Sequence, residues 1–190
     1  MSSRNTLVRS LHDVGLASWF GGSLMGAIGL NGAAQEVADE KERTLVASAG
    51  WARWTPVAAA SIGAHLIGGA ALLVANRRRV AGQAGVTANS VVKTVVTGAA
   101  MAATAYSGVL GAKVAQAGRV PAEGGVVPNE QTPDDVARAQ QQLRLVQWAI
   151  PALTGVLLVL TAQQGEQQKP EEIAAGTAKR ALQALRRTPR

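Results

Sequence analysis

Four apolar stretches, each about as long as a bilayer-crossing helix, constrain the fold of this 190-residue chain more than any other feature. A hydrocarbon core about 30 Å thick needs a helix of about 20 mostly apolar residues, because each residue rises about 1.5 Å. Nearly all charged residues lie between the stretches or in the tails. We therefore predict an all-α fold, a four-transmembrane-helix bundle in residues 1–168, with spans at 11–34, 56–76, 91–117 and 145–162.

The composition supports the membrane interpretation. Charged residues make up 16% of the chain, against about 25% in soluble proteins. The chain has 21 Gly but one Phe and one Tyr, so a soluble core would bury little apolar area, whereas small residues let helices approach closely in lipid. No Cys is present, which excludes disulfides and thiolate metal sites built from this sequence.

A basic tail follows the last predicted span. Residues 169–190 are predicted to form an amphipathic helix on the membrane, with Ile173, Leu182 and Leu185 on one arc. A solvated basic tail is the alternative. The net charge of +7 indicates contact with anionic lipid headgroups and not with nucleic acid, because no stacking aromatics accompany the basic residues. The residues predicted to lie at the membrane surface are Arg77, Arg78, Arg79, Lys179, Arg180, Arg186 and Arg187.

The distribution of Lys and Arg predicts the orientation. If the N-terminus is cytoplasmic, 12 of the 19 basic residues fall on the cytoplasmic side, and eight of the 12 acids fall on the other side. The positive-inside rule then favours both termini in the cytoplasm. Arg outnumbers Lys, and Ala, Gly and Val are abundant, which indicates a GC-rich bacterial genome. The predicted location is the bacterial plasma membrane.

Prolines and aromatic residues predict local features of the spans. Pro56 suits the first turn of a helix, and Trp51 and Trp54, which flank an Arg, are typical of the headgroup layer. A helix is predicted to start at 132–135 and to continue into the fourth span, where Pro151 is expected to kink it. The linker at 118–132, rich in Gly and Pro, is predicted to be irregular.

Small residues recur every four positions in three of the spans. Such faces permit close contact between helices, and Gly22 with Gly26 forms a G-x-x-x-G element. We call these rows of small residues ladders. They are expected to pack the helices of one chain against each other, and contact with a second copy in a homo-oligomer or with a membrane protein partner is the alternative. The predicted packing residues are Ser18, Gly22, Gly26, Ala60, Ala64, Gly68, Thr104, Gly108 and Ala112.

One histidine is predicted to lie deep in the membrane. His65 is about ten residues from either end of the second stretch, and ionisable groups at that depth usually face the protein interior. Together with Met25 and Met101 it could bind copper(I), and alone it could bind haem as an axial ligand. The alternative is a neutral His65 that hydrogen-bonds a neighbouring helix, for example through Thr97, Thr104 or Ser107.

The first stretch carries Leu11-His12 followed by Trp19-Phe20-Gly21-Gly22. This pattern resembles the opening helix of copper-resistance D-type membrane domains. The resemblance implies a several-helix membrane domain linked to metal handling, although this chain is shorter and poorer in histidine. The whole chain also looks like uncharacterised four-helix membrane proteins of GC-rich bacteria, a resemblance that implies no activity.

No catalytic motif is recognisable. The chain has no P-loop, no H-E-x-x-H and no nucleophile with a convincing base. We therefore expect a non-enzymatic membrane protein without a cofactor, a structural or accessory component that acts by helix packing or partner binding. The alternative is a metal- or haem-binding protein, or a small-solute transporter, centred on His65.

Overall fold

The computed structural model describes residues 6–75, 77 and 84–166, and within them the fold is all-α, as predicted, without a β-strand. The helices are α1 (Thr6–Met25), the π-helical turn η1 (Gly26–Leu30), α2 (Asn31–Gln35), α3 (Arg43–Ala75), α5 (Ala84–Gln116) and α6 (Asp134–Glu166). Because α1, η1 and α2 follow one another without a break, the described chain forms four long helical runs.

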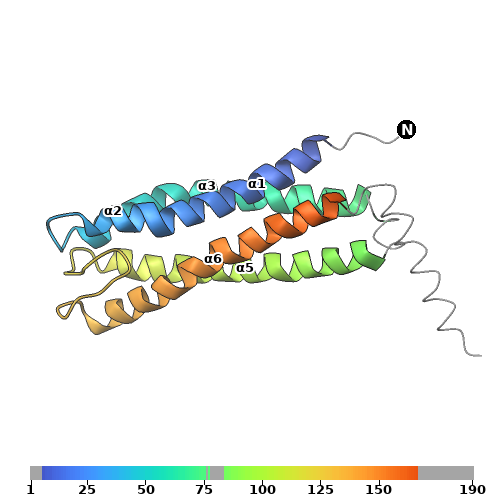
Figure 1. Cartoon of the computed structure of the whole chain (residues 1–190). Coiled ribbons are helices and arrows are strands. Elements are labelled where there is room, and N and C mark those ends of the chain that lie inside the picture. Colours follow the sequence, from blue (N-terminus) through green and yellow to red (C-terminus); the bar gives the residue numbers. More distant parts are fainter. Residues whose placement is uncertain (1–5, 76, 78–83, 167–190) are drawn as a thin grey trace, which may run out of the picture.

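The four runs lie side by side and alternate in direction (Figure 1). α1 packs along α3, α5 packs along α6, and α1 also contacts α6, whereas α3 and α5 touch each other little. The assembly is therefore two tight hairpins joined through α1 and α6. The loops at 36–42 and 117–133 lie at one end, which we call the loop end, and the start of α1 lies at the other.

Three helices are long and apolar enough to cross a membrane, namely those at 43–75, 87–116 and 134–163. They include residues 56–75, 91–116 and 145–162 of the second, third and fourth predicted spans. The first predicted span, 11–34, is helical but is not among them: α1 has 20 residues and carries Arg9, His12 and Asp13 in its first half.

The prediction that Pro56 lies in the first turn of a helix was wrong. α3 begins at Arg43, and Pro56 lies inside the helix and not in its first turn. Proline removes one backbone donor, which leaves the carbonyl four residues earlier, here that of Ala52, without its helical partner. The Thr55 hydroxyl donates to the neighbouring Trp51 carbonyl at 2.9 Å. Pro151 likewise lies within α6, where the Thr154 hydroxyl donates to the Ile150 carbonyl at 2.7 Å.

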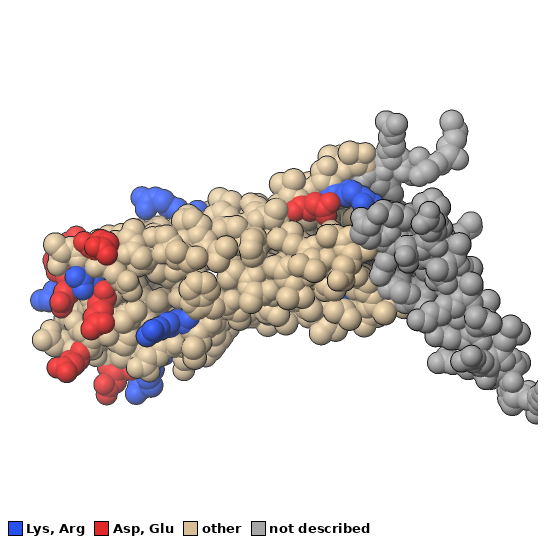
Figure 2. Space-filling model, viewed as in Figure 1, with Lys and Arg blue, Asp and Glu red and all other residues tan. Residues whose placement is uncertain are grey.

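Charged residues gather at the loop end. On the face shown in Figure 2, Lys, Arg, Asp and Glu cluster there, a small charged patch lies towards the other end, and the surface between is mostly uncharged. Arg119 forms ion pairs with Asp39 at 3.0 Å and with Glu42 at 2.9 Å, which tie the two loops together. These pairs are exposed, so each contributes about 1 kcal/mol at most.

The loop from 117 to 133 is irregular, as predicted, apart from one isolated bridge between Gly124 and Val127. Gly118 ends α5 with φ of +69°, a conformation that favours glycine. Arg43 also fixes this loop, because its Nη1 donates to the carbonyls of Ala122 and Glu123 at 3.4 and 3.3 Å.

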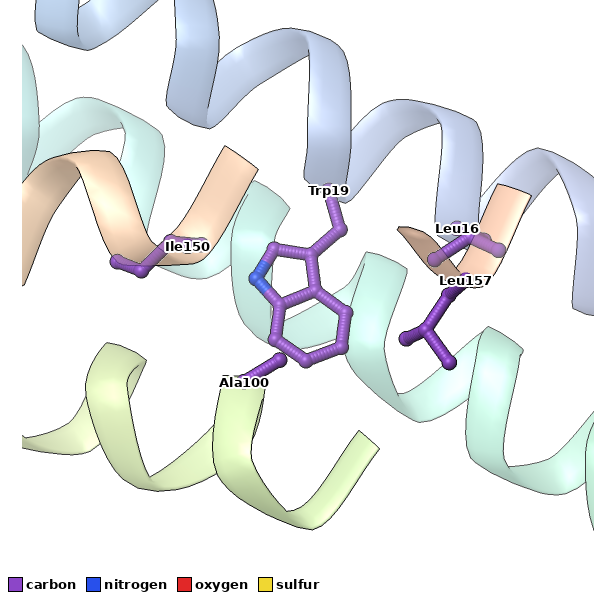
Figure 3. Packing of buried hydrophobic residues seen from close by; sticks show 5 residues of the cluster. All are labelled: Leu16, Trp19, Ala100, Ile150 and Leu157. Atoms are coloured by element: carbon purple, nitrogen blue, oxygen red, sulfur yellow. The ribbon is translucent and has the colours of Figure 1, made fainter. Parts of the chain in front are cut away.

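A small apolar core fills the middle of the assembly. The Trp19 indole from α1 lies among Leu16, Ala100, Ile150 and Leu157, so that α1, α5 and α6 all contribute (Figure 3). Trp19 is 1% exposed, and Leu16 and Leu157 are fully buried. This core separates two polar regions, one towards the start of α1 and one towards the loop end.

The C-terminal helix predicted at 169–190 lies outside the described residues, as do Arg78, Arg79, Lys179, Arg180, Arg186 and Arg187. Arg77 is described, and it is exposed.

Candidate functional site

A pair of buried imidazoles lies between the core and the start of α1. The ring centroids of His12 on α1 and His65 on α3 are 4.3 Å apart, and the two residues are 5% and 3% exposed. His65 Nδ1 is 3.1 Å from the His12 carbonyl oxygen, and His12 Nδ1 is 2.8 Å from Asp13 Oδ1. His65 thus hydrogen-bonds a neighbouring helix, but its partner is a backbone carbonyl of α1 and not Thr97, Thr104 or Ser107.

Two further charges act on this pair. Lys93 on α5 lies within electrostatic range of Asp13, His12 and His65. Three helices therefore bring two imidazoles, one carboxylate and one amine together. We call His12, Asp13, His65 and Lys93 the polar cluster. Sequence analysis found His65 but missed the other three as a group, because only the packing of α1 on α3 brings His12 to the depth of His65.

The predicted copper(I) ligands do not converge. Gly15 contacts the backbone of His65, and Met25 follows ten residues later, about 15 Å further along α1. Met25 is 62% exposed, and Met101 on α5 is 38% exposed. Among the described residues no group of three His, Asp or Glu could hold a metal ion. The residues therefore do not fit the copper site proposed from His65, Met25 and Met101.

Haem bound by His65 alone as an axial ligand stays a prediction.

Close contact between α1 and α3 depends on glycines, though only in part on those predicted. A Cβ at Gly68 would lie 2.5 Å from the His12 backbone nitrogen, so Gly68 does permit close approach. On α1 the reciprocal residue is Gly15, where a Cβ would lie 2.5 Å from the Ser61 carbonyl oxygen. Sequence analysis missed Gly15. Ala60 of the predicted α3 ladder is exposed.

The G-x-x-x-G element has a different role from the one predicted. Gly22 faces the Trp54 indole and Gly26 faces the Trp51 indole, so the glycines accommodate aromatic side chains and not another backbone. Both rings pack against α1, and their place in the headgroup layer stays a prediction. Ser18, the first residue of that ladder, is half-buried.

A buried amide network links three helices near the loop end. Asn31 Nδ2 donates to Gln147 Oε1 at 2.5 Å, and Trp51 Nε1 donates to Asn31 Oδ1 at 3.1 Å. Asn31 follows the π-helical turn η1, whose wider winding changes the direction of the residues after it. Sequence analysis missed this network, although an Asn within an apolar stretch is itself a signal of interhelical hydrogen bonding.

Between α3 and α5 lies a cavity of about 520 Å³, which we call the groove. The predicted ladder on α5, Thr104, Gly108 and Ala112, lines it. Thr104 also contacts α1, because the Trp19 indole Nε1 donates to its hydroxyl oxygen at 3.2 Å. A Cβ at Gly108 would meet nothing within 4 Å. Trp19, Trp51 and Trp54 supply aromatic walls.

Comparison with known proteins found no relative: no protein-family model matches the chain, and no curated protein or solved structure is similar to it.

Proposed function

We propose that this chain is a multi-pass protein of the bacterial plasma membrane with four spans, of which the run from α1 to α2 is the fourth. Residues 6–35 form a continuous helical run about 45 Å long, enough to cross a hydrocarbon core. The run packs along α3, one of the three helices apolar enough to cross. The excess of Lys and Arg in three segments of the sequence, the N-terminal tail, residues 77–93 and the C-terminal tail, supports cytoplasmic termini.

Within the membrane the protein acts as a non-enzymatic accessory component that binds another molecule. The observation that carries this proposal is the groove: it is large enough for a ligand, it lies between two hairpins, and none of its lining residues is charged or a histidine. Indoles, methyl groups, hydroxyls and amides can bind a molecule, but they offer no general base or activated nucleophile.

Single cysteines in this cysteine-free chain test both proposals. In intact cells, Lys41→Cys is expected to react with an impermeant thiol reagent, whereas Ser3→Cys is expected to react only after permeabilisation. Labelling of Ser3→Cys from outside would instead mean that the α1–α2 run does not cross.

The second proposal is tested by cross-linking: Ala105→Cys, in the groove, is coupled to a photoactivatable cross-linker in native membranes. We expect one captured species, and its loss when Gly108→Leu fills the groove.

A second candidate function is proton transfer at the polar cluster. It is favoured by the close approach of His12 and His65, with Asp13 and Lys93 around them, because grouped ionisable residues in membrane helices often form proton relays.

Proton flux across vesicles tests this candidate. Vesicles that contain the wild-type protein and an internal pH dye are expected to lose a pH gradient several-fold faster than vesicles with His65→Gln, because the variant cannot carry a proton at that position. Ser107→Ala, in the groove, is the matched control and should behave as the wild type. Equal rates for wild type and His65→Gln would leave the cluster a structural role. Metal analysis and a visible spectrum of the same sample check the copper and haem alternatives.

A further inference from the structure

We infer that His12 passes protons through its ring to Asp13, and that Asp13 releases them to water at the start of α1. This inference rests on the second candidate function, proton transfer at the polar cluster, because it assigns the route by which a proton leaves that cluster.

The hydrogen bonds fix which nitrogen of each ring carries a proton. A backbone carbonyl can only accept, so His65 Nδ1, which lies 3.1 Å from the His12 carbonyl oxygen, is the donor. A carboxylate also only accepts, so His12 Nδ1, which lies 2.8 Å from Asp13 Oδ1, is the donor there. A neutral imidazole has one N–H, and therefore Nε2 is the atom of each ring that can accept a further proton.

The two histidines differ in what their Nδ1 protons can reach. The partner of His65 Nδ1 is a carbonyl oxygen, which does not hold a proton at neutral pH, so a proton that binds His65 Nε2 must leave from the same atom. The partner of His12 Nδ1 is a carboxylate, which can take up a proton. The ring centroids are 4.3 Å apart, so His12 is in contact with His65 and is placed to receive its proton. His12 can therefore conduct a proton through its ring, whereas His65 cannot.

Each transfer conserves protons and charge. A proton forms an N–H bond at His12 Nε2, the Nδ1–H bond breaks, and the proton released there binds Asp13 Oδ1. The Asp13 side chain is 45% exposed and that of His12 only 6%, so water reaches Asp13 and removes the proton there. Rotation of the imidazole resets it for the next transfer. Arg9 and Lys93 lie within electrostatic range of His12, and their positive charges favour release of the proton over its retention on the ring.

Asp13→Asn tests the inference in the vesicle assay of the second candidate function. Asparagine keeps an oxygen that accepts a hydrogen bond from His12 Nδ1, but an amide does not take the proton up. We expect the proton flux to fall several-fold, to the rate of His65→Gln, and Asp13→Glu to recover most of it. Asp39→Asn, the same change at an exposed carboxylate of the loop end, is the matched control and should behave as the wild type.

NMR of the histidine ring nitrogens gives a second readout that does not depend on flux. In the wild type and in Asp13→Asn we expect neutral His12 to carry its proton on Nδ1. A neutral His12 protonated on Nε2 would overturn the inference. Wild-type flux in Asp13→Asn would overturn it too, while a loss of flux in His65→Gln would leave the second candidate function intact. If His65→Gln and the wild type have equal flux, both fail.

Discussion

Replacing Gly68 with leucine is expected to force α3 away from α1 and to destabilise the first hairpin severely. The new Cβ would lie 2.5 Å from the backbone nitrogen of His12 and 2.8 Å from its Cα. Backbone atoms cannot rotate away as a side chain can, so the whole helix must move. Overpacking that side chains can absorb costs about 1–3 kcal/mol, and we expect a loss of about 3 kcal/mol or more here. Unfolding of the detergent-solubilised protein by increasing SDS, followed by circular dichroism, measures it.

Gly63→Leu is the matched control for this prediction. Gly63 lies on the same helix, and a Cβ there meets nothing within 4 Å, so the same change should cost much less. Gly15→Leu should reproduce the defect from the other side, since its Cβ would lie 2.7 Å from the His65 backbone nitrogen. Equal stability of the Gly68 and Gly63 variants would mean that the two helices do not meet at Gly68.

The helical class and three of the spans could be predicted because both follow from the chain's own composition. Long apolar runs between charged segments have few solutions other than helices in lipid, and the structure has three such helices. The start of α3 was missed because Pro56 was interpreted as a start signal. In fact residues 43–55 are helical and pack beside the run from α1 to α2, and that contact is invisible in the sequence of α3 alone.

The face of α3 that contacts α1 was predicted correctly at Ala64 and Gly68 but not at Ala60, and helix geometry explains the error. Steps of four residues turn 400°, so the ladder of Ala60, Ala64 and Gly68 drifts by about 40° at each step. Two steps from Gly68 the drift reaches about 80°, and Ala60 is exposed. The buried residues alternate steps of three and four and so keep a single direction: Ala58, Ser61, His65 and Gly68.

The candidate sites were less predictable than the fold, because each is made by residues distant in sequence. His65 was identified from its depth alone, but Lys93 joins it only because the second hairpin packs on the first. The groove exists because α3 and α5 do not pack tightly, and small residues in a sequence favour close packing and a cavity equally. Gly108 shows this ambiguity directly, since the residue type is the same as at Gly68 but its surroundings are empty.

The buried amide network provides the second large effect. Asn31→Leu keeps a side chain of similar size but removes the partner of both Gln147 and Trp51. Two polar groups would then be buried unpaired, at about 1–3 kcal/mol each by soluble-protein standards. Interhelical hydrogen bonds in membranes average about 0.6 kcal/mol, so we expect a total loss of about 2 kcal/mol in the same SDS unfolding measurement.

Adding Gln147→Leu to Asn31→Leu separates hydrogen bonding from packing. Removing both partners of a hydrogen bond is close to neutral, whereas removing one leaves the other unsatisfied. The double variant is therefore expected to be less destabilised than the sum of its single changes, and a double-mutant cycle measures the difference. Trp51 keeps its unpaired indole in every Asn31 variant, so recovery should be partial. If the losses of stability in the two single variants add up to the loss in the double variant, the two amides have no interaction free energy. Apolar contacts alone would then hold this part of the first hairpin against α6.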